Sequence, residues 1–363
     1  MSLRLLKEGA VEFYAEPAGT TVGPASSDSP VFYNPAMRHS RDVSVCLCGA
    51  LGFAAGKRLL DGMAASGVRG LRLAVEACPG AEVTINDRDD EAFEAIGRGI
   101  ERTGASNAVA SNEDLRHLLH RGRYDYVDVD PFGSPVPFVD AAIRSCKKMA
   151  VLAVTATDTA ALSGTFPRTC ERRYMARSLL NECAHELGAR LLAGFVVRQG
   201  AVHDIAVRPL LCYSREHYFR CYFQVRAGAG RADALLTQAG YANFDPDGER
   251  WTSKHPEAKR WAGPLWSGEM FDPDLLDAMV GFESGSEIEI SKDLRLWRAE
   301  SGGPAYHRDV AELSRRFKTS QPRMDRLLER LRGDGYFAER TSFAPTGIRT
   351  DATTEELRFL FSE

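Results

Sequence analysis

The chain lacks several features that would assign it to a protein class at once. None of its apolar runs reaches the roughly 18–20 residues that a membrane helix needs, so no membrane partner is expected. The first residues, MSLRLLKEGAVEFYAEPAG, carry glutamates where a secretory signal would need an uninterrupted apolar core. These absences predict a cytoplasmic protein.

Paired cysteines are absent as well. The eight cysteines are scattered along the sequence, and no two of them form a C-x-x-C pair. A disulfide framework is not expected in a long chain with enough apolar residues for a large core. A cysteine-rich zinc site usually draws on closely spaced pairs. The thiols are therefore predicted to be free and mostly buried, with no metal site.

The sequence has no strong overall charge of either sign, since its formal net charge is −4. Two stretches are nevertheless locally basic. Residues 168–226 hold ten arginines, no lysine and five acids, and residues 308–349 hold ten basic and six acidic residues. Such stretches can form phosphate-binding surfaces within a mildly acidic protein, although solvated helix faces give the same pattern.

What the sequence does contain is an alternation of strand-like and helix-like segments from residue 58 to about residue 226. Strands are expected at RLLDGMAA, EVTINDR, NAVASN, YDYVDVD, KKMAVLAVTATD, ARLLAGFVVR (189–198) and YFRCYFQVR. Helical spacing occurs between them, for example in DEAFEAIGRGIERTG. This alternation predicts an α/β fold of the doubly wound, Rossmann-like kind, with a mostly parallel sheet covered on both faces.

The pattern changes after residue 226. Glycines and prolines punctuate an irregular connector, and two short amphipathic helices follow in DVAELSRRF and QPRMDRLLERLRGDGYF. The next segment, AERTSFAPTGIRTD, is typical of a strand and an arm. This order predicts a smaller α+β C-terminal domain with a winged-helix-like part, which suits nucleic-acid binding or protein–protein contact. We place the domains at residues 1–262, with an N-terminal extension, and 263–363.

Acidic residues follow three of the expected strands. In open parallel sheets, ligands bind beyond the carboxyl ends of the strands. Asp61 lies in LLDGMAASGVRG, whose small residues let the backbone approach a ligand. Asp87 stands where an acid commonly binds ribose hydroxyls, and Asp114 in SNEDL could accept from an exocyclic amine. Tight turns and helix caps, with Asn112 or Glu113 capping in the last case, remain the structural alternatives.

The fourth strand ends in VDVDPFGSPVPFVDAA. The Asp130 carboxylate and the Pro131 carbonyl can accept hydrogen bonds from an amine on a flat base, and the Phe132 ring can stack on that base. Such stacking contributes roughly 1–3 kcal/mol per base. The alternative is an Asx turn at Asp130 with Phe132 in the core. Four such strand ends in one fold together favour a functional site.

Seven pieces of the sequence, in order from about residue 31 to residue 352, match one family. They are VFYNPAMRHSRDVSV, LLDGMAASGVRGLR, VTIND, DVDPFGSPVPFVDAA, VTATDTAALSGTFPRTCERRY, GPLWSG and FAPTGIRTDA. The chain thus resembles the tRNA guanine-26 N2-dimethyltransferases of archaea and eukaryotes. The resemblance implies a class I methyltransferase that uses S-adenosylmethionine and methylates the exocyclic amine of a guanine at the hinge between the D arm and the anticodon arm.

The resemblance also implies roles for individual residues. The cofactor contacts would come from Arg41, Arg69, Asp87, Asp114 and Leu115, and we add Asp61 for its place at a strand end. The acceptor pocket would consist of Asp130, Pro131 and Phe132. The expected partner is tRNA, with no DNA partner, and a monomer is favoured.

One stretch departs from the family. Many relatives carry cysteine pairs, which are thought to bind zinc, shortly before the GPLW piece. Here YANFDPDGERWTSKHPEAKRWAGPLW contains no cysteine. We therefore expect no structural zinc, and packing of Trp251, Trp261 and Trp266 in its place.

For the mechanism, we expect Asp130 to hold the amine and take its proton, and Phe132 to clamp a flipped-out base. Two alternatives are open: an adenine or cytosine amino-methyltransferase acting on DNA or RNA, and a non-catalytic RNA-binding protein. The sequence leaves open whether position 26, position 27 or both are modified, and whether the product is mono- or dimethylated.

Overall fold

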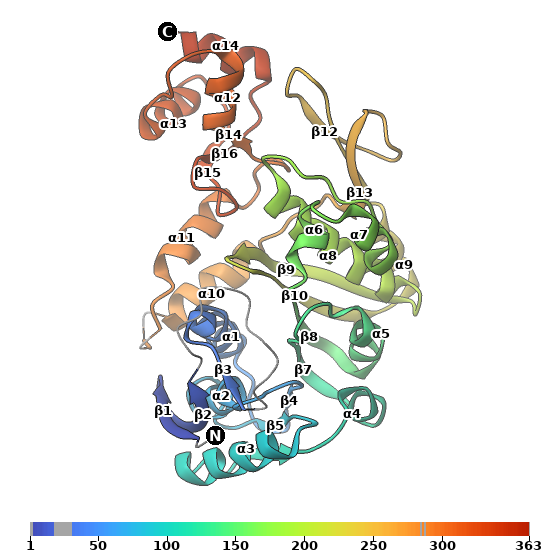
Figure 1. Ribbon diagram of the computed structural model, residues 1–363, viewed down its shortest axis with the longest axis vertical. Coiled ribbons are helices and arrows are strands. Elements are labelled where there is room, and N and C mark those ends of the chain that lie inside the picture. Colours follow the sequence, from blue (N-terminus) through green and yellow to red (C-terminus); the bar gives the residue numbers. More distant parts are fainter. Residues whose placement is uncertain (1–2, 18–30, 284, 287, 363) are drawn as a thin grey trace.

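The computed structural model describes residues 3–17, 31–283, 285–286 and 288–362. Its centre is a seven-stranded sheet in the order β6-β5-β4-β7-β8-β10-β9 (Figure 1). The strands are β4 (Arg58–Asp61), β5 (Glu82–Asn86), β6 (Ala108–Ser111), β7 (Tyr124–Val129), β8 (Cys146–Ala156), β9 (Ile205–Arg215) and β10 (Tyr218–Ala227). The first five are parallel and β10 runs antiparallel to them, whereas β9, which pairs antiparallel with β10, runs in the same direction as the first five. The chain changes direction across the sheet between β4 and β7, which is where a doubly wound sheet binds ligands.

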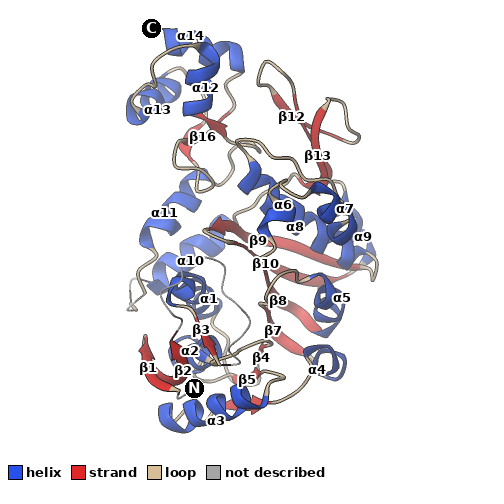
Figure 2. Ribbon diagram, in the orientation of Figure 1, coloured by secondary structure: helices blue, strands red, loops and turns tan. Residues whose placement is uncertain are grey.

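Helices cover both faces of this sheet (Figure 2). One layer holds α1 (Arg38–Leu51), α2 (Val68–Arg72) and α3 (Asp90–Thr103). The other holds α4 (Leu115–Arg121), α5 (Val136–Ser145), α8 (Ala184–Ala201) and α9 (Ala229–Leu236), with α6 (Thr159–Leu162) and α7 (Pro167–Tyr174) against α8. The predicted doubly wound α/β fold is confirmed. Within the described residues, no helix is long and apolar enough to cross a membrane.

Two small sheets flank the central one. At the N-terminus, β1 (Arg4–Glu8), β2 (Val11–Pro17) and β3 (Phe32–Tyr33) form a sheet that packs on α3. After α9, β11 (Ala239–Phe244) pairs with β12 (Arg250–Ser253) and β13 (Arg260–Trp266), and β13 packs on α8. In this second sheet Trp266 is buried, and Arg177 stacks on the ring of Trp261. The proposed domain division after residue 262 stays a prediction; this position lies inside β13.

The C-terminal part begins with α10 (Pro273–Glu283), which packs on α1, and α11 (Ser291–Glu300). We call residues 308–362 the C-terminal module. It holds β14 (Arg308–Asp309), α12 (Val310–Phe317), α13 (Met324–Gly333), β15 (Ala338–Arg340), β16 (Gly347–Thr350) and α14 (Thr354–Ser362). The order of helix, turn, helix and strand pair agrees with the sequence. The module has an apolar core of its own, with Val310, Leu331 and Ile348 fully buried.

Buried charges join the C-terminal module to the larger part of the chain. The Glu186 carboxylate, on α8, accepts from Arg349 Nη1 at 2.9 Å and lies 2.8 Å from His307 Nδ1. Arg349 also donates through Nε to Glu300 at 2.7 Å. Burial alone would raise the pKa of Glu186, but the Arg349 and Arg190 charges hold it well below its usual range. We call this contact between the C-terminal module and the larger part of the chain the seam. It depends on buried charges that compensate one another where the side chains are not hydrated.

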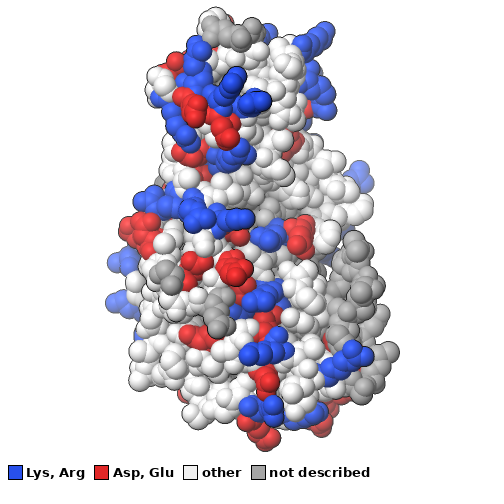
Figure 3. Space-filling view, turned by 90° about the vertical axis from the view of Figure 1, so that its left-hand side faces the viewer, with Lys and Arg blue, Asp and Glu red and all other residues white. Residues whose placement is uncertain are grey.

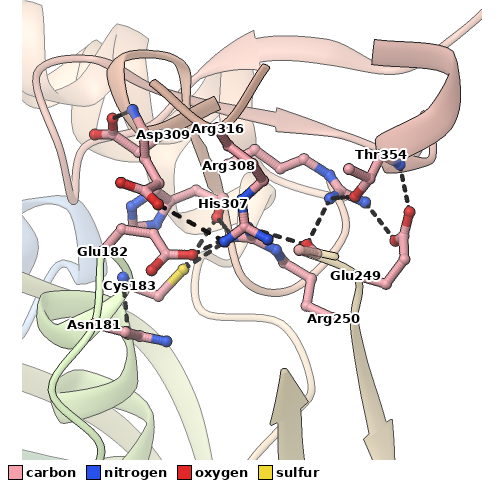
Figure 4. Close-up of polar contacts among 12 residues, drawn as sticks. Asn181, Glu182, Cys183, Glu249, Arg250, His307, Arg308, Asp309, Arg316 and Thr354 are labelled. Carbon is pink, nitrogen blue, oxygen red and sulfur yellow. Dashed lines mark hydrogen bonds and ion pairs between the residues drawn. The ribbon is translucent and has the colours of Figure 1, made fainter. Parts of the chain in front are cut away.

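A second set of polar contacts lies where the β11–β12 turn meets the C-terminal module (Figure 4). Arg308 donates to Glu249 at 2.9 Å and to the Thr354 hydroxyl at 2.8 Å. Arg250 donates to the Cys183 sulfur at 3.1 Å at the start of α8. Each arginine joins segments that are far apart in sequence, so together they fix how the module is oriented.

Two sequence expectations need correction. The segment 189–198 was expected to be a strand, but it lies inside α8, whose residues are almost all buried. A run that is apolar on every side does not distinguish a buried helix from a buried strand.

The second correction concerns the two basic stretches, because only some of their arginine side chains lie on the surface. Arg190 and Arg220 in the first stretch, and Arg308 and Arg349 in the second, are buried. Lysine and arginine side chains still gather on the C-terminal part and in a band below it, with acids among them (Figure 3).

Candidate active site

A cavity of about 200 Å³ opens beyond the carboxyl ends of β4, β7 and β8. Its walls come from five parts of the chain: β3 with the start of α1, the turn after β4, the segment after β7, the residue after β8, and the β9–β10 turn. The lining includes Phe32, Tyr33, Arg41, Asp61, Ala64, Ala65, Ser66, Arg69, Asp130, Pro131, Phe132, Thr157, Glu216, His217 and Tyr218. Six of the nine predicted site residues therefore line one space.

The turn between β4 and α2 forms one wall. Gly67 has a φ of 75°, a left-handed conformation that glycine adopts readily. The residues before it are small, so the backbone lies open to a ligand. Asp61 Oδ2 accepts a hydrogen bond from Gly70 N at 2.9 Å. Burial, together with the nearby Asp128 and Asp130 charges, raises the pKa of Asp61 to about 7.

The segment after β7 forms the opposite wall. The β7 strand ends at Val129, so Asp130 leaves the sheet and its carboxylate faces the cavity. Arg69, from α2, donates a hydrogen bond to Asp130 Oδ2. Phe132 is 54% exposed although it is a large apolar residue, which argues against the core alternative. Its ring meets Phe32 edge to face, with the ring centroids 5.4 Å apart and an interplanar angle of 69°.

A buried charge network lies beneath this wall. Asp128 is fully buried on β7, and Arg220 on β10 donates to its Oδ1 at 2.9 Å. Arg69 Nη1 lies 3.4 Å from Asp128 and donates to the Ser44 hydroxyl at 2.8 Å. Burial would raise the pKa of Asp128, but the Arg220 and Arg69 charges lower it below its usual value. Asp128 therefore stays ionised and helps to fix Arg69, which in turn holds Asp130.

The N-terminal hairpin fixes the remaining wall. Arg41 Nε donates to Glu8 Oε1 at 2.7 Å, and the Tyr33 hydroxyl donates to Glu8 Oε2 at 2.9 Å. Arg72 donates to the same carboxylate at 2.9 Å. Burial opposes the charge of Glu8, but the hydrogen bonds and charges of Arg41 and Arg72 lower its pKa to about 2. Glu8 thus anchors two residues of the cavity wall, Arg41 and Tyr33.

Three predicted cofactor residues do not line the cavity. Asp87 contacts the turn after β4, where its Oδ2 accepts a hydrogen bond from Ala65 N at 2.8 Å. Asp114 is the N-cap of α4 and accepts from Arg116 N at 2.9 Å. The cap is thus Asp114 itself, not the neighbouring Asn112 or Glu113. Leu115 is buried. Cofactor contact by Asp87, Asp114 and Leu115 stays a prediction.

Sequence reasoning did not select Phe32, Glu8 or the β9–β10 turn as parts of the site. Phe32 occurs in one of the family-like pieces, VFYNPAMRHSRDVSV, so a signal was present. Glu8 and the turn residues Glu216 and His217 gave none, because only the tertiary fold brings them to the site. Among the described residues, no group of three or more His, Cys, Asp or Glu could hold a metal ion.

Comparison with known proteins gives a consistent result. Residues 9–360 match the family model for N2,N2-dimethylguanosine tRNA methyltransferase. The tRNA (guanine(26)-N(2))-dimethyltransferase of Thermococcus kodakarensis is 36% identical over 346 residues, covering 90% of this chain and 91% of that protein. The enzyme of the same name from Pyrobaculum neutrophilum is 37% identical, with 99% of each chain covered.

A solved structure, Trm1 from Pyrococcus horikoshii in complex with S-adenosyl-L-methionine, superposes with a TM-score of 0.89. It is 33% identical, and the match covers 99% of both chains. The fold and the family expected from the sequence are thereby confirmed. The chain belongs to the N2,N2-dimethylguanosine tRNA methyltransferase family.

Proposed function

We propose that this protein transfers methyl groups from S-adenosylmethionine to the exocyclic N2 amine of guanine 26 in tRNA. Family membership along nearly the whole chain supports the enzyme class, the cofactor and the tRNA substrate. The observation that carries the proposal is the cavity at the strand ends, where Asp130 and Pro131 face two aromatic rings.

The cavity suits both groups that the reaction brings together. The small residues Ala64, Ala65 and Ser66 leave the backbone open on the β4 side, where a nucleoside-containing cofactor would lie. S-adenosylmethionine supplies an electrophilic methyl group on a positively charged sulfur.

Phe32 and Phe132 are placed to clamp the base. In the structure their rings touch, and a guanine would enter by separating them and stacking on one or both faces. The target guanine lies within folded tRNA, so it must leave its stack, at a cost of a few kcal/mol. Stacking on an aromatic side chain contributes roughly 1–3 kcal/mol of binding free energy per base. The remaining contacts with the tRNA supply the difference.

Asp130 is the proposed proton acceptor. Arg69 occupies Oδ2, and no other described residue donates to Oδ1, which leaves this oxygen for the N2 amine. The amine nitrogen forms a bond to the methyl carbon, the carbon–sulfur bond breaks, and the amine proton passes to Asp130. The Pro131 carbonyl can hold the second N–H. A second transfer requires the remaining N–H to reach the same acceptors.

Nucleoside mass spectrometry of a tRNA transcript incubated with the purified protein tests this proposal. We expect N2-methyl- and N2,N2-dimethylguanosine at position 26, and a transcript with adenine at that position should gain no methyl group there. Methylation at position 27 without position 26, or of adenine or cytosine amines in RNA or DNA, would contradict the assignment to guanine 26. Asp130→Asn keeps the shape of the side chain but loses the acceptor, so the rate should fall by about 10²–10⁴-fold. Cofactor affinity should stay near normal, and a variant that keeps most of its activity would refute the role of Asp130.

A monomeric, cytoplasmic protein remains the expectation. Light scattering after size-exclusion chromatography measures the first property directly. A dimer in solution would contradict it.

A further inference from the structure

Helix α7 and the residues before it are fixed next to the acceptor motif. Gly133 N donates to the Thr157 hydroxyl at 2.6 Å, and Thr157 lines the cavity. The Ser134 and Tyr174 hydroxyls lie 3.0 Å apart, and Tyr174 donates to Asp158 at 2.5 Å. The segment 157–174 therefore moves with the acceptor wall, and whatever it exposes lies at a fixed distance from the target base.

Two large apolar side chains are exposed here, one within this segment and one six residues beyond its end. Phe166 is 59% exposed, and Leu180 is 63% exposed. Phe166 N donates to Ala160 O at 2.9 Å, and Ala160 is three residues from Thr157, at most about 11 Å along the chain. The backbone of Gly164 lies directly against Leu180, which brings the two exposed side chains into one neighbourhood. An exposed aromatic this close to a base-binding pocket indicates a surface for another base.

The same helix presents cations outward. Arg168 and Arg172 are four residues apart, on the face opposite the buried Cys170 and Tyr174. Both arginines are exposed. Arg172 contacts only Thr169 Oγ1, at 3.3 Å, and Arg168 has no partner in the described part of the chain. No carboxylate among the described residues pairs with either guanidinium, so both can bind phosphate.

The acids nearby do not cancel this charge. Asp158 is already paired with Arg173 at 2.9 Å and with the Tyr174 hydroxyl. Glu171 is the one acid within α7, against three arginines. A rigid surface that combines an aromatic ring with unpaired arginines is typical of single-stranded RNA binding, in which bases stack and phosphates pair with cations.

We propose that Phe166, Arg168 and Arg172 bind the tRNA strand that flanks the flipped guanine. The inference rests on the proposed function and adds the surface that binds the nucleotides next to the target guanine. Phe166 stacks on a neighbouring base, and Arg168 and Arg172 pair with the adjacent phosphates. This surface is distinct from the C-terminal module and lies on the methyltransferase part of the chain.

The test measures tRNA affinity of the full-length protein at several salt concentrations. The variant Arg168→Ala/Arg172→Ala should weaken binding about tenfold, and the slope of log affinity against log salt should decrease by about 1.5, as expected for two lost phosphate contacts. The matched control is Arg98→Ala/Arg102→Ala, which removes two exposed arginines with the same spacing from α3 at the far end of the molecule. This control should bind within twofold of the wild type.

Phe166→Ala should lower kcat/KM for tRNA about tenfold and leave the affinity for S-adenosylmethionine unchanged. Unchanged thermal midpoints and cofactor affinity show that the variants are folded. Affinity and salt slope equal to the wild type in the α7 double variant, or an equal loss in the α3 control, would overturn the inference. Binding is read without catalysis, so a wild type that binds tRNA but methylates no guanine would overturn the proposed function and leave this result intact.

Discussion

The buried pair of Asp128 and Arg220 gives the sharpest test of the site's construction. Both side chains are fully buried, and Arg220 donates to both carboxylate oxygens, at 2.9 and 2.5 Å. Asp128→Asn removes the negative charge with little change of shape. It leaves Arg220 in the core with the Thr155 and Ser44 hydroxyls as its remaining partners. Breaking a buried pair in this way costs about 3–5 kcal/mol.

This loss is large against the usual stability of a domain, about 5–15 kcal/mol. At about 2–4 °C per kcal/mol for a domain of this size, the thermal midpoint should fall by roughly 6–20 °C. The pKa of Asp128 is lowered in the folded protein, so its contribution is present above the unfolded value of 3.8 and is lost as the pH falls below it. The difference between wild type and variant should therefore be full at pH 7 and shrink toward pH 3.

The assay is a thermal melt followed by circular dichroism, with the double variant Asp128→Asn/Arg220→Gln as the control. The double variant no longer buries an unpaired charge. It should be more stable than the sum of the two single losses predicts, by about 2–4 kcal/mol. A single variant that loses less than about 1 kcal/mol, or strictly additive losses, would refute the view that these charges compensate each other in the core.

Three further predictions concern charged side chains, two at the site and one at the junction with the C-terminal module. Asp61→Asn should raise the thermal midpoint more at pH 8 than at pH 5, because the wild type loses stability as the pH rises from the unfolded pKa of 3.8 to the folded pKa of about 7; an equal shift at both pH values would contradict this. Glu8→Gln should weaken S-adenosylmethionine binding about tenfold by calorimetry, since Arg41 and Tyr33 lose their charged anchor. Glu12→Gln in the same hairpin should have no effect, because the partly buried Glu12 pairs with Arg102 and does not line the cavity. Glu249→Gln should raise KM for tRNA several-fold with kcat unchanged, because Arg308 loses its carboxylate partner at the module junction (Figure 4); an effect on kcat alone would rule out a positioning role.

Local patterns were sufficient to predict the parallel part of the sheet. The strands β4, β5 and β7 are short apolar runs that end at acids, and each ends within a few residues of the position expected from the sequence. Helix α8 could not be recognised in its second half, because its apolar residues face the core on every side and lack a polar stripe. The strand β9, at the edge of the sheet, was missed for a related reason, since the preceding helix was partly interpreted as a strand.

The sequence predicted some residues of the site but not others. Asp128 and Asp130 are two residues apart, so alternation alone would place them on the same face of one strand. The strand ends at Val129, which leaves Asp128 in the core and turns Asp130 toward the cavity. Residue patterns narrowed the substrate to an amine on a flat base, and the identity of the base came from the family resemblance. Phe32 and Glu8 reach the site through a hairpin far away in the sequence, and single-sequence periodicity carries no such information.

The seam between Glu186 and Arg349 has a consequence for engineering. The buried Arg349 guanidinium is acceptable out of water only because carboxylates outside the C-terminal module, Glu186 and Glu300, compensate its charge. Grafting the last fifty-odd residues onto a homologous scaffold would therefore succeed only if the recipient supplies the matching acid at this position of its helix. A donor and a recipient that differ here should give an insoluble hybrid, however similar their folds.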